Sequence, residues 1–242
     1  MKTLILILLL AALPARADVN ADFAAANRLY QQGNFAAAAA GYEQLVQSGV
    51  VSPALQFNLG NARLKAGSEG RALAAFRQAQ LLAPRATDLR ANLQFARARV
   101  TDAASLRPTT LQRAFARLTL NEWLTLAGLA VAVWFTLLAG RAWRPELRAK
   151  LGGATQLAAL ASGGLLLGAL AAWTLNYSEP AAVVIANEAA VRSGPLDDAT
   201  TVFSLKDGVE LAVTAEREDW LQIRDAQNRS GWLKRTDAQV VP

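Results

Sequence analysis

Two long apolar stretches, at 120–140 and 151–177, lie in the middle of this chain. Each is long enough to cross the roughly 30 Å hydrocarbon core of a membrane as a helix that rises about 1.5 Å per residue. The loop between them, 141–150, contains one acid, Glu146, and four cations: Arg141, Arg144, Arg148 and Lys150. Because short cytoplasmic loops are rich in Lys and Arg, we expect a transmembrane hairpin whose basic loop lies in the cytoplasm. The segments before and after the hairpin would then share the opposite face.

The N-terminus predicts the same arrangement. Lys2 precedes an apolar run at 4–13, and Ala15-Arg16-Ala17 has the small residues of a signal peptidase site. This pattern is typical of a secretory signal peptide at 1–17, cut before Asp18. An uncut signal would act as a further anchor and leave the following segment on the same, periplasmic side.

The chain contains no cysteine and no histidine. Disulfides, thiolate or histidine metal sites and histidine-dependent triads are therefore excluded. Four acids come singly, without paired spacing or a Gly-rich phosphate loop: Glu43, Glu69, Glu210 and Asp219. We expect no catalytic residue, cofactor, metal or small-molecule substrate. The net charge of +6 does not indicate nucleic-acid binding, because several arginines serve the hairpin loop.

Residues 21–100 repeat themselves at an interval of 34 residues, which places an expected repeat array at 18–100. Four positions recur clearly: Asn27 at Asn61, Gly33 at Gly67, Ala38 at Ala72, and Tyr42 at Phe76. The small residues let antiparallel helices approach closely, and the glycines end the first helix of each pair. The period and these residues resemble tetratricopeptide repeats, most clearly in the second copy. The resemblance implies an all-α array that ends in a solvating cap helix at 86–100.

Tetratricopeptide arrays bind peptides or partner helices in a concave groove lined by the first helix of each repeat. The resemblance assigns the partner-binding positions to Asn27, Tyr30, Gln31, Phe57, Asn61, Leu64 and Lys65 and, from the cap, Phe95 and Arg99. The alternative for the asparagines is that they satisfy helix backbones between repeats. A clamp for a partner's C-terminal carboxylate is not expected, because its basic positions fall on Phe23, Asp88 and Asn92.

The segment 101–119 connects the repeats to the first apolar stretch. Residues 101–108 are typical of a linker, and three apolar residues then share one helical face: Leu111, Phe115 and Leu118. This pattern predicts a helix on the membrane surface or, alternatively, a solvated helix against the repeat cap. Asn121 before Glu122 predicts the start of the first spanning helix.

Small residues recur at intervals of four inside the two spans. They are Gly128 and Ala132 in the first, and Gly164, Gly168 and Ala172 in the second. Small faces permit close helix packing, so we expect them to pack the hairpin, with oligomerisation as the alternative.

After Pro180 the sequence changes to short β-rich runs at 182–185, 189–191, 201–205, 209–213, 220–223 and 230–233. We expect five strands that close into a small barrel at 181–242. The segment 191–195, the turn 206–208 and the stretch 219–223 resemble bacterial SH3 domains in their order. In that family, Trp220 and Trp232 either pack the barrel or line a groove for peptide or cell-wall glycopeptide. Arg192 would anchor a turn or contact the same ligand.

The order of signal, repeats, two spans and SH3-like barrel resembles the aerotolerance-operon family called BatE, as does the stretch 88–99. The resemblance implies a multi-domain membrane protein of the bacterial inner membrane that acts as a non-enzymatic scaffold in the lipid bilayer. Its implied partners are membrane proteins with von Willebrand A domains and a MoxR-type ATPase. The alternative is a peptidoglycan-binding envelope protein that positions a cell-wall enzyme.

Overall fold

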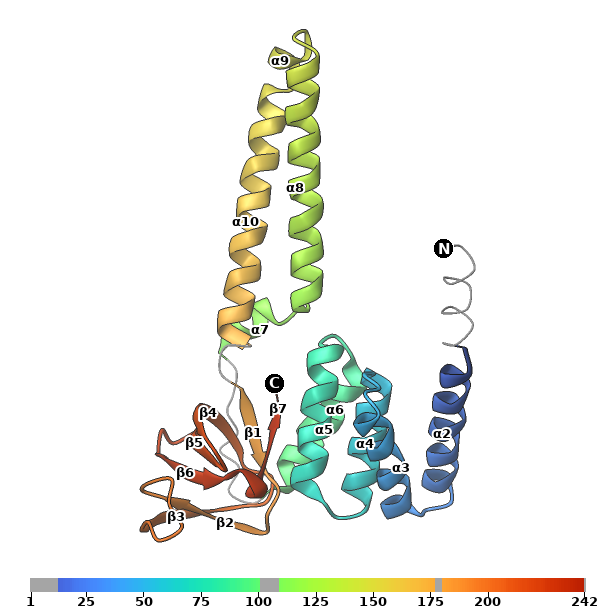
Figure 1. Ribbon diagram of the computed structural model, residues 1–242, viewed down its shortest axis with the longest axis vertical. Helices are drawn as coiled ribbons and strands as arrows, with labels where there is room; N and C mark the ends of the chain where they lie inside the picture. The colour runs from blue at the N-terminus through green and yellow to red at the C-terminus, as the bar shows by residue number, and fades with distance from the viewer. Residues whose placement is uncertain (1–12, 101–108, 177–179, 242) are drawn as a thin grey trace, which may run out of the picture. The chain divides into compact units, whose positions relative to one another are not determined.

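A computed structural model of the chain describes residues 13–100, 109–176 and 180–241 (Figure 1). The chain divides into two compact units. One unit combines Met1–Leu106 with Pro180–Pro242, and the other is Arg107–Glu179. The apolar part of the expected signal peptide and the expected linker at 101–108 lie outside the described residues.

The N-terminal half of the first unit consists of α-helices. They are α2 (Leu13–Gln31), α3 (Phe35–Gln47), α4 (Pro53–Lys65), α5 (Glu69–Leu82) and α6 (Thr87–Arg99). The 34-residue period is visible in their starts, because α5 follows α3, and α6 follows α4, at this interval. Gly33 and Gly67 end α2 and α4 with φ of 79° and 81°, a left-handed conformation that glycine adopts without strain.

Small residues set the distance between these helices. Ala38 and Ala72 are completely buried, as expected for contacts between helices. A Cβ added to Gly60 would lie 2.6 Å from the ring of Phe76, so only glycine lets α4 and α5 approach this closely. Tyr42 and Phe76, one period apart, fill the equivalent spaces at 1% and 0% exposure.

The C-terminal part of the first unit is an antiparallel sheet of seven strands, β1 (Ala181–Val184), β2 (Glu188–Arg192), β3 (Thr201–Lys206), β4 (Glu210–Arg217), β5 (Trp220–Arg224), β6 (Ser230–Lys234) and β7 (Ala238–Val241). Their order is β3-β2-β6-β5-β4-β1-β7, and residues such as Val191, Leu221 and Leu233 fill the core. The expectation of five strands was wrong. All six β-rich runs form strands, and the seventh strand, β7, was not predicted. It is short, follows a 3₁₀ turn at Arg235–Asp237 and pairs along its full length with β1.

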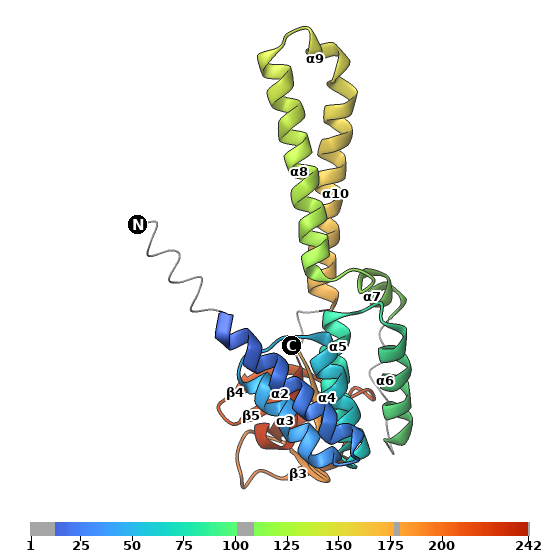
Figure 2. The same ribbon diagram turned by 90° about the vertical axis from the view of Figure 1, so that its right-hand side faces the viewer.

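The second unit is a helical hairpin with α7 (Thr110–Phe115), α8 (Leu120–Trp143), α9 (Leu147–Lys150) and α10 (Gly152–Asn176). The two long helices lie side by side in Figures 1 and 2. By length and composition, both could cross a membrane. Large apolar side chains such as Leu129 and Leu160 are exposed along them, which suits a lipid environment.

The start of α8 differs from the expectation in a small way. Thr119, not Asn121, caps the helix, and Glu122 completes a capping box by accepting a hydrogen bond from the Thr119 amide. The preceding helix α7 packs on α10, where Gln112 donates to the carbonyl of Leu175 at 2.9 Å.

The small residues of the spans fall into two groups. A Cβ on Gly168 would lie 2.6 Å from the Trp123 ring, and Ala172 is buried, so these two pack the hairpin. Gly128 and Gly164 have no neighbour within 4 Å of such a Cβ. The expected packing role therefore applies to part of the small-residue face.

Candidate binding surfaces

The helical and β regions of the first unit dock against each other through α5, α6, β1 and β7 (Figure 1). Val183 and Val241 complete the apolar cluster of Phe76, Leu89 and Leu93 between α5 and α6. The cap helix expected at 86–100 is therefore not only a solvating cap: one side of it shares a core with the sheet. The reason is that the sheet supplies apolar side chains for the seam that the last repeat leaves open.

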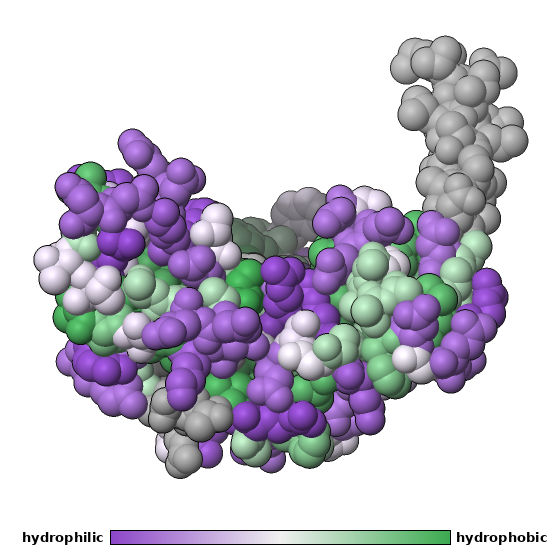
Figure 3. Space-filling view, turned by 90° about the horizontal axis from the view of Figure 1, so that it is seen from below, coloured by the Kyte–Doolittle hydropathy of each residue, from purple (hydrophilic) through white to green (hydrophobic). Residues whose placement is uncertain are grey.

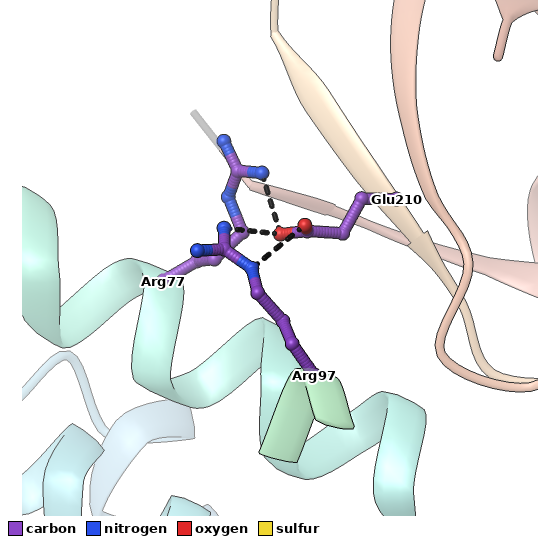
Figure 4. A network of polar contacts seen from close by, with 3 residues as sticks. All are labelled: Arg77, Arg97 and Glu210. Carbon is purple, nitrogen blue, oxygen red and sulfur yellow. Dashed lines mark hydrogen bonds and ion pairs between the residues drawn. The ribbon is translucent and has the colours of Figure 1, made fainter. Parts of the chain in front are cut away.

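A buried carboxylate stabilises this docking. Glu210, at the start of β4, is 2% exposed and receives both arginines of the α5–α6 seam (Figure 4). Arg77 Nη1 lies 2.7 Å from Oε1, while Arg97 donates through Nε to Oε2 and through Nη2 to Oε1, each at 2.9 Å. Burial alone would raise the pKa of Glu210, but the hydrogen bonds and charges of Arg97 and Arg77 outweigh it and lower the pKa. The group is a structural ion triad rather than a free acid.

A second carboxylate, that of Asp207 in the turn between β3 and β4, caps the N-terminus of α5 although it is far away in the sequence. Ser68, the N-cap residue, makes no side-chain cap bond, and the Gly70 amide instead donates to Asp207 Oδ2 at 3.0 Å. Burial raises the pKa of Asp207, although the Gly70 hydrogen bond opposes the shift. A Cβ on Gly70 would overlap Asp207 and the Val184 carbonyl. Glycine at this position is therefore what lets the sheet reach the helix N-terminus.

A ladder of amides crosses the expected groove. Asn27 Oδ1 accepts from the Tyr42 hydroxyl at 2.6 Å and from Asn58 Nδ2 at 3.2 Å. One repeat later, Asn61 Oδ1 accepts from Asn92 Nδ2 at 2.8 Å. The alternative that these asparagines satisfy helix backbones is thus not what the structure shows, because they bond to other side chains on neighbouring helices. A pocket of about 100 Å³ opens beside the ladder, lined by Asn27, Tyr30, Gln31, Tyr42, Asn58 and Asn61.

The other expected groove residues divide by exposure. Phe57 and Leu64 are half-buried and pack against the α5–α6 cluster, so part of their role is structural. Lys65 is exposed, and Phe95 is 57% exposed. Arg99 pairs with Glu69 at 2.9 Å and lies 5.8 Å from the Phe95 ring centre.

The three expected sheet residues lie on one face. In the register, Arg192 is opposite Trp232 and Trp220 is opposite Lys234, and all four alternate with core residues such as Leu221 and Leu233. Both tryptophans therefore lie on the outer face of the sheet, not in its core. Trp220 is nevertheless 8% exposed, covered by the neighbouring loop.

Arg192 holds the loop that covers Trp220. Its guanidinium donates to the carbonyls of Asp197 and Ala199, and it lies 5.9 Å from the Trp220 ring centre. Lys234 Nζ lies 5.6 Å from the same ring and pairs with Asp197, whose pKa it lowers. A cavity of about 360 Å³ adjoins Trp220 and is lined by Pro195, Leu196, Arg217 and Glu218; Trp232 is not among its lining residues.

Three of the four single acids noted in the sequence bind arginines. Besides Glu210 and Glu69, Glu43 pairs with Arg63 at 2.8 Å. Arg77 and Arg97 were not predicted as partners of these acids, although the 34-residue period indicates them. They stand one period after Glu43 and Arg63, so the second seam has two cations where the first has an ion pair.

Comparison with known proteins identifies the sheet. Residues 186–237 match the bacterial SH3 domain family. No curated protein matches the chain. The C-terminal region is thus a bacterial SH3 domain, a class that commonly binds peptidoglycan or proteins. The match leaves out β1 and β7, which carry Val183 and Val241, so the apolar part of the docking surface lies outside the matched domain.

Polar side chains cover most of the surface in the view of Figure 3, with small apolar areas between them. The exposed large apolar residues described in the first unit are scattered along the sequence: Val51, Leu82, Phe95, Leu196 and Val202. Isolated apolar residues are usual on a soluble surface. The pocket beside the asparagine ladder, called here the amide groove, and the Trp220 cavity are therefore the two candidate binding sites.

Proposed function

We propose that the chain is a non-enzymatic scaffold of the bacterial inner membrane, anchored by α8 and α10, with its tetratricopeptide-like helices and SH3 domain in the periplasm. The observation that carries this proposal is the buried triad of Arg77, Arg97 and Glu210. It joins segments that precede and follow the apolar hairpin in sequence. Both segments must then occupy one compartment, as a two-span anchor requires.

The proposed main partner site is the amide groove. Its pocket combines the amides of Asn27, Gln31 and Asn61 with the ring of Tyr30. Lys65 and Phe95 lie about one helical turn beyond Asn61 and Asn92 on the same helices. Hydrogen-bonding groups beside exposed aromatic area suit a peptide or a partner helix. By the resemblance to BatE, the proposed partners are membrane proteins with von Willebrand A domains and a MoxR-type ATPase system.

A binding role also accounts for the ionisable groups better than catalysis does. Glu43, Glu69 and Glu210 are each engaged by arginine, and Glu210 is held below its ordinary pKa. A general acid or base needs a pKa near the working pH. Glu210, with its lowered pKa, does not suit that task.

The Trp220 cavity supports a second candidate function, peptidoglycan binding. Its aromatic ring, the cation Arg217 and the exposed Leu196 suit a glycopeptide, and Arg192 lies 5.9 Å from the Trp220 ring centre. In this alternative the SH3 domain holds the wall and the helices position a wall enzyme.

A pair of matched variants tests the groove. Lys65→Gln with Phe95→Ala removes one exposed cation and one exposed apolar side chain near the groove, and Arg28→Gln with Val51→Ala removes one of each elsewhere in the helical region. Each full-length variant is crosslinked in native membranes, purified and analysed by mass spectrometry. We expect the first variant to lose about tenfold of its co-purified membrane partners, as for truncation at an interface anchor, and the second to keep them.

The same experiment has an arm for the alternative. Leu196→Ser with Arg217→Gln alters the cavity beside Trp220, and the detergent-solubilised full chain is sedimented with peptidoglycan sacculi. If this variant loses sacculus binding that the wild type shows, while the groove variant keeps its partners, the wall-binding function is the correct one.

The membrane arrangement has its own test. The chain has no cysteine, so single cysteines at Ala149 and Ser204 have no background. We expect an impermeant thiol reagent to label the Ser204 site, not the Ala149 site, in cells with a permeabilised outer membrane. The reverse pattern would contradict the proposed orientation.

A further inference from the structure

The loop between α8 and α10 gathers cations without acidic partners. Arg144, Arg148 and Lys150 are exposed and Arg141 is half-buried. Within the described residues, none of these four joins an ion pair, and neither does Glu146. Some exposed arginines elsewhere in the chain are paired with acids, as Arg99 and Arg235 are, whereas here four cations share one short segment. The loop therefore has a net positive charge that no ion pair among the described residues neutralises.

The backbone holds these cations together. The Leu147 amide donates to the Arg144 carbonyl and the Arg148 amide to that of Pro145, which forms a tight turn. The Arg148 side chain folds back, and its Nε donates to the Arg141 carbonyl at 3.3 Å. This contact keeps the Arg148 guanidinium at the end of α8, and its Nη groups remain available to a ligand.

The loop also carries an exposed aromatic side chain. Trp143, in the last turn of α8, is 89% exposed, directly beside Arg144. Tryptophan is favoured at the level of lipid headgroups because its ring is apolar and its N–H is polar. A Trp beside unpaired guanidinium groups at the end of an apolar helix presents both kinds of contact that a phospholipid offers.

We propose that the loop 141–150 binds the headgroups of anionic phospholipids. Phosphate oxygens accept from Arg144, Arg148 and Lys150, and guanidinium groups suit this role because they bind phosphate through two parallel hydrogen bonds. The Trp143 ring lies among the glycerol and upper acyl groups. The inference rests on the proposed insertion of α8 and α10, but it goes further: a basic loop that only sets orientation would have no lipid preference in the finished protein.

Lipid retention tests the proposal. The full chain is reconstituted into nanodiscs of mixed phosphatidylglycerol and phosphatidylcholine and extracted in mild detergent, and the lipids that remain bound are measured by mass spectrometry. Each cation near an anionic surface contributes about a fivefold preference, so Arg144→Gln with Arg148→Gln should lower phosphatidylglycerol enrichment by roughly tenfold or more. The matched control is Arg113→Gln with Arg117→Gln, which removes two exposed cations of the same unit outside this loop. The control should keep the enrichment.

Three outcomes would overturn the proposal. They are equal retention of both lipids by the wild type, an equal loss in both variants, and displacement of phosphatidylglycerol by an excess of inorganic phosphate, which would indicate a site for free phosphate. Incorporation into pure phosphatidylcholine nanodiscs separates this result from the anchoring function. A chain that inserts into pure phosphatidylcholine nanodiscs but shows no phosphatidylglycerol enrichment in the mixed ones contradicts only the lipid site. A chain that fails to insert into the pure nanodiscs contradicts the membrane anchor.

Discussion

The two seams of the helical region occupy equivalent places in the 34-residue period and are closed in different ways. In the first, Glu43 on α3 pairs with Arg63 on α4. In the second, the equivalent residues are Arg77 on α5 and Arg97 on α6, and the acid between them is Glu210 from the sheet. The charges of the first seam neutralise each other, while the two arginines of the second seam need an acid from another part of the chain. A reversal of charge at one repeat position thus goes with a change from an internal contact to a docking site.

The largest test of this difference is Glu210→Gln. The change leaves Arg77 and Arg97 together and half-buried without their acid. Removing one partner of a buried ion pair costs about 3–5 kcal/mol. Hydrogen exchange of the full chain in detergent should show the amides of α5 and β1 opening with a free energy lowered by that order, while those of α3 keep their protection.

The matched control is Glu216→Gln. Glu216 and Arg235 are as close as Glu210 and Arg77, at 2.7 Å, but their side chains are 44% and 50% exposed. Exposed pairs contribute at most about 1 kcal/mol. Equal losses from Glu216→Gln and Glu210→Gln would show that burial is not what gives the triad its strength.

Arg77→Glu sharpens the comparison by copying the first seam into the second. The new acid pairs with Arg97 but lies beside Glu210, so we expect docking to weaken by about 2–3 kcal/mol. Adding Glu210→Gln removes the repulsion, and the double variant should be more stable than Arg77→Glu alone in the same exchange measurement. Strictly additive losses would mean that positions 77 and 210 do not interact.

Gly70→Ala tests the backbone side of the docking. Alanine normally stabilises a helix relative to glycine by up to about 1 kcal/mol. Here the Cβ would overlap Asp207 and the Val184 carbonyl, so we expect a net loss of about 1–3 kcal/mol at the α5–β1 contact. Gly194→Ala is the control, because its Cβ would meet only Ala199 at 3.9 Å. A gain in protection at α5 would mean that the sheet does not press on the helix.

The smallest expected effect is a dependence on pH with opposite signs at the two carboxylates. Glu210 has a lowered pKa, so its stabilisation is present above the ordinary value of 4.5 and is lost as the pH falls through the folded-state value. Asp207 has a raised pKa, so its ionisation weakens docking as the pH rises above the ordinary 3.8. Asp207→Asn should therefore be slightly more stable than the wild type at neutral pH and indistinguishable below 3.8. Thermal unfolding across this range measures both, and a Glu210→Gln variant with unchanged acid sensitivity would contradict the first assignment.

Features that recur at a regular interval could be predicted from the sequence, and single contacts between distant segments could not. The interval of 34 predicted the recurring helix starts, and the six β-rich runs coincide with six of the seven strands, although only five strands were expected. The amide ladder was predicted in part, since Asn27 and Asn61 recur but their bonds to Asn58 and Asn92 depend on helix spacing. Asp207 looked like an ordinary turn residue and Glu210 like a lone acid. Their roles depend on the docking of distant segments, which no local pattern records.

The cap that Asp207 supplies to α5 also has a consequence for the order of events during synthesis. Gly70 and Asp207 are separated by 137 positions, and Arg77 and Glu210 by 133. A ribosome completes α5 and α6 long before it reaches β4 and β7. During that interval the helix N-terminus lacks its cap, two like charges share the seam, and the apolar surface that later receives Val241 faces solvent. Until β7 is synthesised, the helical segment is thus a partly folded intermediate that exposes apolar surface to proteases and chaperones.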